Sequence, residues 1–341
     1  MIWLTWRQFR AQAAVLYAAL AALGVLLLVT GLRLHSGSGA VLDRFSGGGT
    51  YQAVYLLGLA AVLAAPAVIG VFWGAPLITR ELDSGTHRLV WNQSVTRTGW
   101  LASKLAVVGL AAVTATGALS LMTTWWSAPI TRAATGGHVP SSSGLPGFAS
   151  ERFSPVSFAA HGVVPIGYAA FAFTLGVTVG AVVRRTLPAI AATLALFVAV
   201  QVAVPFWIRP HLITPARLTT EITTANLRGF MASGPGAPAH VTVSIGKPGA
   251  WIISNQTLDP AGRVIDALPA WATNCAPPPG QPGTTAQREC FAKLSDLGYR
   301  QLVTYQPADH YWALQWAETA TFLTAALALT GLCFWRIRRL T

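Results

Sequence analysis

The chain contains 341 residues, of which 53% are hydrophobic and only 10% are charged. Soluble domains carry about 25% charged residues, so a soluble globule of this composition would lack polar side chains to cover its surface. The composition therefore excludes an ordinary soluble enzyme or binding domain and favours a membrane protein.

The hydrophobic residues are gathered into six long runs. Five runs contain no charged residue, and the sixth, between His310 and Arg336, contains only Glu318. About 20 apolar residues cross the hydrocarbon core as a helix, because a helix satisfies its own backbone hydrogen bonds there. We therefore expect an all-α polytopic membrane protein with spans at about 13–32, 53–77, 105–127, 161–183, 187–208 and 312–334. The first run exceeds the 7–15 apolar residues of a signal peptide, so an uncleaved helix is expected.

Basic residues are unequally distributed between the two sides of such a chain. With the amino terminus inside, the short inner segments hold eleven of them: Arg7, Arg10, Arg80, Arg88, Arg97, Lys104, Arg184, Arg185, Arg336, Arg338 and Arg339. The two short outer loops hold only Arg33, Arg44, Arg132 and Arg152. Since Lys and Arg near span ends favour the cytoplasmic side, both termini are predicted to be cytoplasmic.

The formal net charge of +12 does not indicate nucleic acid as a partner. The basic residues form short flanks at the predicted membrane boundaries, not one continuous face, and no DNA-binding motif is present. Anionic headgroups of membrane lipids are the expected partners of these flanks.

Residues 209–311 form the only sizeable segment outside the predicted spans. Its twelve prolines favour irregular and extended structure, and residues 241–245 and 301–305 alternate as strands do. Cys275 and Cys290 fall here, on the predicted oxidising side, and a disulfide between them would contribute about 3 kcal/mol. Two unpaired thiols are the alternative, and a zinc site is not expected because no paired ligand spacing accompanies them.

The longest predicted inner connection, residues 79–104, holds charges of both signs. Residues 86–91 are predicted to form a short helix with apolar residues on one side. Such an element suits docking onto a soluble partner, and a solvated connector with topogenic arginines is the alternative. The residues that recur in a known family at this position are Glu81, Gly85-Thr86, Leu89, Ser94-Val95-Thr96-Arg97 and Lys104-Leu105.

With these residues the connection resembles the same loop in permease subunits of type-2 ATP-binding-cassette exporters. Six spans, inner termini and a large outer segment between spans five and six are similar to that family as well. The stretch from Tyr305 to Glu318 is similar to actinobacterial members. The resemblance implies a location in a bacterial plasma membrane.

The resemblance also implies a coupling helix that seats in a cleft of a cytoplasmic ATP-binding-cassette ATPase. The residues implied in this contact are Glu81, Gly85, Thr86 and Arg88. His87 departs from the family, because many members have an aliphatic residue there. Arg97 and Lys104 are predicted to lie at the lipid headgroups. Two permease subunits, identical or related, would assemble with two ATPase subunits, and the chain itself needs no cofactor.

The residues before the first span are expected to form an interfacial connecting helix, as in that family. Trp6 and Phe9 fall on one helical face, while Arg7 and Arg10 are polar. Indole rings and arginines suit a helix that lies in the headgroup layer. An ordinary basic flank is the alternative.

Glu318 is the only carboxylate within a predicted span, where a central charge costs about 2.5–3.5 kcal/mol. Two interpretations fit it. It lines a substrate path for a cation, or it reaches the outer headgroups near the positive end of its helix. Residues 70–74 and 176–180 are small-residue repeats, which predict close packing between helices.

Catalytic patterns are missing from the sequence. It contains no phosphate loop, no H-E-x-x-H pair and no G-x-S-x-G turn, and its histidines are too isolated for a metal site. The predicted function is a non-catalytic permease subunit of an ATP-driven exporter. The alternatives are a membrane-embedded enzyme acting on lipid or peptide, and a membrane scaffold or sensor that displays residues 209–311. The predicted domains are 1–12 (connecting helix), 13–208 (five spans, with the coupling loop at 79–104), 209–311 (outer segment) and 312–341 (sixth span and basic tail).

Overall fold

The computed structural model describes residues 2–36, 49–83, 96–135, 152–232, 239–275 and 285–339. The chain folds into two compact units. The first unit contains Met1–Leu212 and Trp312–Thr341, and the second contains Ile213–Tyr311. Each unit has its own hydrophobic core and is described by itself.

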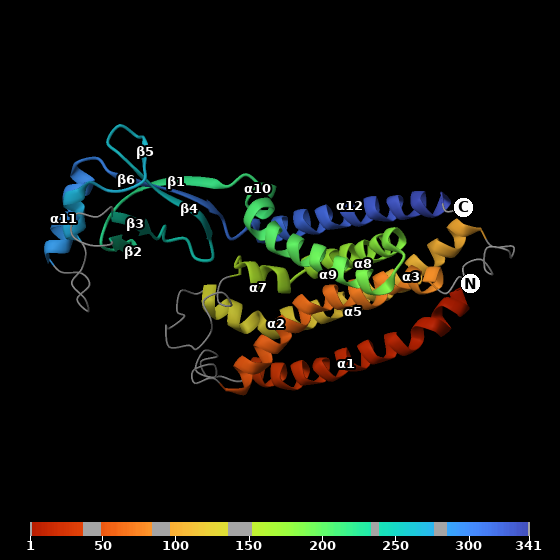
Figure 1. Ribbon diagram of the computed structural model, residues 1–341. Coiled ribbons are helices and arrows are strands. Elements are labelled where there is room, and N and C mark those ends of the chain that lie inside the picture. Colours follow the sequence, from red (N-terminus) through yellow and green to blue (C-terminus); the bar gives the residue numbers. More distant parts are fainter. Residues whose placement is uncertain are drawn as a thin grey trace. The chain divides into compact units, whose positions relative to one another are not determined.

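The first unit is a bundle of long helices (Figure 1). Within the described residues, six helical stretches are long and apolar enough to cross a membrane: Phe9–His35, Thr50–Glu81, Thr98–Arg132, Val164–Val183, Thr186–Leu212 and His310–Arg338. They confirm the six spans predicted from the sequence. The protein is therefore a multi-pass membrane protein.

The elements of this unit differ in regularity. Their bounds are α1 Ile2–Ser36, α2 Thr50–Ile69, η2 Gly70–Gly74, α3 Ala75–Asp83, α5 Arg97–Thr135, α7 Pro155–Ala160, α8 Val164–Val183, α9 Thr186–Ala203, η3 Val204–Ile208, α10 Arg209–Leu212 and α12 His310–Arg338. The π-helical turns η2 and η3 interrupt the second and fifth spans. A proline accompanies each turn. Pro205 lies inside η3, and Pro76 follows shortly after η2. Proline lacks an N–H donor and crowds the preceding turn, which explains the local widening.

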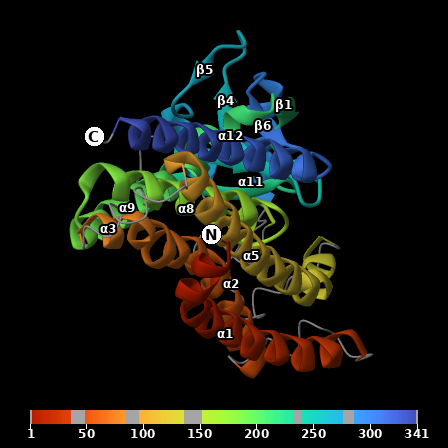
Figure 2. The ribbon, with the colours of Figure 1, turned by 90° about the vertical axis from the view of Figure 1, so that its right-hand side faces the viewer.

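Helix α8 lies at the centre of the bundle, against α2, α5 and α9 (Figure 2). Its backbone is in direct contact with the second span through the two small-residue repeats. A Cβ atom on Gly176 would lie 2.2 Å from the carbonyl oxygen of Gly70, and one on Gly74 would lie 2.5 Å from that of Phe173. Only glycine fits at such distances, so the predicted close packing is confirmed, and the two repeats pack against each other.

Two hydrophobic clusters fill the bundle, one towards each end. The first contains Phe9, Trp73, Trp100, Val177 and Ile337, and we call its location the α3 end. The second cluster joins the later part of α1 to α2 and to the later part of α5. Since the first cluster includes residues near the start of α1 and near the end of α12, both of these helix ends lie at the α3 end (Figure 1).

The second unit combines strands with short helices. A four-stranded antiparallel sheet has the order β1-β6-β4-β5, and β2 pairs with β3. The bounds are β1 Ala216–Glu221, β2 Leu227–Ala232, β3 Ala239–Val243, β4 Trp251–Leu258, β5 Val264–Ile265, η4 Ala270–Cys275, α11 Thr285–Asp296 and β6 Arg300–Gln306. The predicted strands correspond to β3 and β6, with slightly shifted ends. Helix α11 was not expected from the proline-rich composition, but no proline falls within its own residues, so nothing of that kind breaks it.

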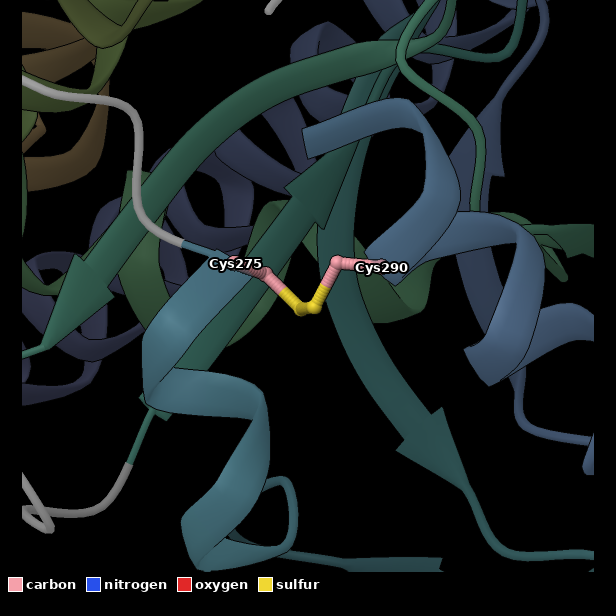
Figure 3. Close-up of a disulfide and its surroundings, with 2 residues drawn as sticks. All are labelled: Cys275 and Cys290. Atoms are coloured by element: carbon pink, nitrogen blue, oxygen red, sulfur yellow. A yellow bond between two sulfur atoms is a disulfide. The ribbon is translucent and has the colours of Figure 1, made fainter. Parts of the chain in front are cut away.

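Cys275 and Cys290 form a disulfide that ties η4 to α11, with their Cα atoms 5.5 Å apart (Figure 3). The bond borders the core of the second unit, which includes Phe291, Leu294 and Val303. It spans a sequence separation of 15 residues. In the chain-entropy model a loop of this length contributes about 3 kcal/mol, which helps a unit with a small core.

The contact between the second span and α8 predicts a large effect for the smallest substitution at Gly176. Gly176→Ala places a methyl group against the backbone of Gly70, and such overpacking costs about 1–3 kcal/mol of unfolding free energy or more. The melting temperature of the purified protein in detergent is expected to fall. Gly331→Ala is the control, because nothing lies within 4 Å of its added Cβ atom. If both variants melt like the parent protein, the close contact does not exist.

Candidate functional site

The predicted coupling segment connects two helices, and we call the end of α3 at Asp83 and the start of α5 at Arg97 its two roots. Helix α3 ends at Asp83 and α5 begins at Arg97, and residues 84–95 between them lie outside the described residues. The predicted coupling residues in that stretch are Gly85, Thr86 and Arg88, together with the short helix at 86–91. The geometry of the site is therefore built from its two roots.

Glu81 and Lys104 form an ion pair between these roots. The ammonium group of Lys104 donates to Oε1 of Glu81, and the two side chains are 6% and 17% exposed, Lys104 being the more buried. The same ammonium lies 4.7 Å from the ring centroid of Trp100, within cation–π range. The sequence assigned Glu81 to the ATPase contact and Lys104 to the headgroups, whereas the structure pairs the two side chains inside the bundle.

The start of α5 is fixed by a local cap. The hydroxyl oxygen of Thr96 accepts a hydrogen bond from the N–H of Gly99 at 3.1 Å, and its carbonyl accepts from the N–H of Trp100 at 3.0 Å. Threonine is a favoured residue before a helix because its oxygen satisfies an orphan N–H of the first turn. This cap explains why the helix starts where the Ser94–Arg97 motif ends.

Both roots are packed into the hydrophobic cluster of the α3 end. Ile78 of α3 and Leu101 of α5 are 0% exposed, and Trp100 is 3% exposed. Phe9 of α1 contacts Trp73 edge to face, with ring centroids 4.5 Å apart. The described residues on either side of 84–95 therefore share one close-packed cluster with three spans, and close-packed side chains transmit strain well.

The predicted interface anchors fall at this end as well. Arg7 and Arg10 are exposed on α1, which runs as one helix from Ile2 into the first span. Trp6 and Arg97 lie in α1 and α5, but their side chains are outside the described ones. An in-plane orientation of residues 1–12 thus stays a prediction.

A second pair of charges is buried away from the α3 end. Nε of Arg209 donates to Oε2 of Glu318 at 2.8 Å, and Nη2 donates to Oε1 at 3.1 Å. The hydroxyl of Tyr168 also donates to Oε1. Arg209 and Glu318 are both 0% exposed. The cluster therefore joins the fourth, fifth and sixth spans through charge-assisted hydrogen bonds.

The free-energy cost of burying this ion pair is offset by the geometry of its hydrogen bonds. Removing two charges from water costs several kcal/mol per ion, which is recovered only with good pairing and further hydrogen bonds. The two parallel bonds give that pairing, and the guanidinium carbon of Arg209 lies 4.1 Å from the ring centroid of Phe158. Nη1 of Arg209 has no hydrogen-bond partner among the described residues. Both N–H groups of Nη1 are thus unused donors of the cluster.

Gln315, nearly one turn before Glu318 on α12, fixes the start of α8. Its side-chain oxygen accepts from the N–H groups of Val163 and Val164, both at 3.1 Å, and its amide donates to the carbonyl of Phe158 at 3.1 Å. These bonds satisfy donors at a helix start that would otherwise be orphaned in an apolar environment. The sixth span therefore orders the turn between α7 and α8.

This cluster was not predicted from the sequence. Glu318 was predicted to line a substrate path or to reach the outer headgroups, and no role was predicted for Arg209. A signal was available in the sequence, because these opposite charges lie at similar depths near the predicted outer ends of two spans. In the structure Glu318 is paired and fully buried, so both predicted roles require the pair with Arg209 to open.

Comparison with known families shows what the first unit is similar to. The family described as ABC-2 membrane transporter related matches residues 14–209. The matched stretch covers all or most of each of the first five spans and both roots of the coupling segment. No curated protein and no solved structure matches the chain.

Removing one partner of the buried pair is expected to be costly. Glu318→Gln leaves the guanidinium of Arg209 buried without a countercharge, which lowers the free energy of unfolding by about 3–5 kcal/mol. The measurement is the melting temperature of the purified protein. The double variant Arg209→Met/Glu318→Leu removes both charges and is expected to be more stable than Glu318→Gln. The opposite order of stability would contradict the buried pair.

Proposed function

This chain belongs to the ABC-2 membrane transporter related family, so it is a permease component of an ATP-binding-cassette transporter, and we propose that it couples a separate cytoplasmic ATPase to substrate export. The observation that carries the proposal is the family match over residues 14–209. Permeases of this family are transport components that work with an ATP-binding subunit. In the proposal, this chain neither binds nor hydrolyses ATP.

The proposed contact with the ATPase is the segment between α3 and α5. Gly85, Thr86 and Arg88 would meet the cleft of the ATPase, and Glu81 would act from within the bundle. The ion pair of Glu81 with Lys104 supports this role, because it fastens the two roots to each other. A push on residues 84–95 would then move α3 and α5 together.

A physical route runs from this contact to the other end of the bundle. Helix α3 continues from the π-turn whose glycines touch the backbone of α8, and α8 carries Tyr168, which donates to Glu318. ATP binding would favour one of two arrangements of this chain of contacts, and hydrolysis would release it. Opening of the pair between Arg209 and Glu318 is the proposed change at the far end.

The proposed assembly has two permease subunits, identical or related, and two ATPase subunits. Both termini and residues 84–95 would face the cytoplasm of a bacterium, and residues 213–311 would lie outside its plasma membrane. The unequal distribution of Lys and Arg supports this orientation. Helix ends near both termini share the α3 end with the roots of the coupling segment, as the orientation requires.

Co-purification tests the coupling. The tagged chain is expected to retain an ATPase subunit, and Gly85→Pro, which distorts the coupling segment, is expected to reduce its recovery about tenfold, equal to about 1.4 kcal/mol of binding. Gly49→Pro is the matched control, because Gly49 has a φ of −79°, which proline can adopt. If no ATPase co-purifies with the parent chain, or Gly85→Pro retains both the ATPase and transport, the proposal fails.

A further inference from the structure

A cavity of about 310 Å³ lies beside the Glu81–Lys104 pair. Its walls come from α1, from η2 and α3, and from α5, so residues of three spans line it. Ligand pockets in proteins begin at about 300 Å³. The cavity therefore has room for a small ligand or for part of a larger one.

The charged side chains that line the cavity have a net positive charge. Arg80 and Lys104 line the cavity together with one carboxylate, Glu81. Lys104 is buried, and Arg80 is exposed at the end of the second span. Arg7 and Arg10, exposed on the first turns of α1, add positive charge to the α3 end. An anionic group is thus favoured over a cationic one.

The rest of the lining is largely apolar and aromatic. Phe9, Trp73 and Val108 are buried parts of the wall, while Phe72 lines the cavity and is 58% exposed. Phe72 belongs to the second span, whose exposed side chains face lipid or a partner subunit. A ligand with both an anionic group and an apolar chain matches these walls better than a small soluble anion.

We propose that this cavity binds the headgroup of an anionic phospholipid from the leaflet at the α3 end. Basic pockets between spans are a recurrent site for such headgroups. The phosphate would lie near Arg80 and Lys104, and the first carbons of the acyl chains would contact Phe72. The site is separate from the contact proposed for the ATPase, and its existence does not depend on that contact.

A phosphate at this place would share the ammonium of Lys104 with Glu81. Since that ion pair joins the roots of residues 84–95, lipid binding and the position of the segment would be linked. The lipid composition of the membrane would then affect the position of residues 84–95, and with it the coupling to the ATPase. This consequence follows from the place of the pair between α3 and α5.

The test uses the full chain in phosphatidylcholine nanodiscs with increasing fractions of phosphatidylglycerol. The melting temperature is expected to rise with phosphatidylglycerol, because a ligand of the folded state stabilises it. Arg80→Gln is expected to raise the fraction needed for half of the effect about fivefold, the value of one basic contact at a membrane surface. Arg80→Lys is expected to restore most of the response.

A second variant tests the cavity itself. Gln12→Trp fills it from α1 and is expected to abolish the response, whereas Leu110→Trp, at an exposed position of α5 outside the lining, is expected to retain it. Arg185→Gln, at another exposed arginine, controls for net charge. The proposal is overturned if phosphatidylglycerol gives no rise, if Arg80→Gln and Gln12→Trp both respond like the parent, or if inorganic phosphate alone reproduces the rise.

Discussion

The bundle depends on the direct backbone contact between the second span and α8. In hydrocarbon, helices gain little from hydrophobic burial against each other, so close packing of small residues becomes a main source of association. Gly70, Gly74 and Gly176 allow that approach, and a side chain at any of them would meet a backbone atom. This contact places α8 at the centre and decides which faces of the other spans can meet.

Two ion pairs then complete the ends of the bundle. Glu81 pairs with Lys104 where the coupling segment leaves it, and Arg209 pairs with Glu318 away from that end. Each pair joins different spans, and each is largely removed from water. Breaking a buried ion pair is costly as long as packing holds its two side chains in place. Such pairs are therefore suited to holding the helices in one of two arrangements. This is why the proposed route for coupling runs between them.

The sequence was sufficient for the parts of the structure that follow local rules. The six spans follow from the need to satisfy backbone hydrogen bonds in hydrocarbon, and β3 and β6 follow from alternation. The ion pairs were not predicted, although Glu81, Lys104 and Glu318 had each been singled out. Pairing between spans depends on which helix faces meet, and the glycine contact sets that in three dimensions. Helix α11 was missed because composition averaged over residues 209–311 hides a proline-free stretch.

We propose above all that residues 84–95 lie in the cytoplasm and contact the ATPase subunit. Thiol accessibility tests this location most directly. The three native cysteines give a low background, because two form a disulfide and Cys333 is 1% exposed. Ser84→Cys is predicted to react with an impermeant maleimide only after the cells are permeabilised, while Glu221→Cys, exposed in the second unit, reacts in intact cells. Reaction of Ser84→Cys in intact cells would contradict the account.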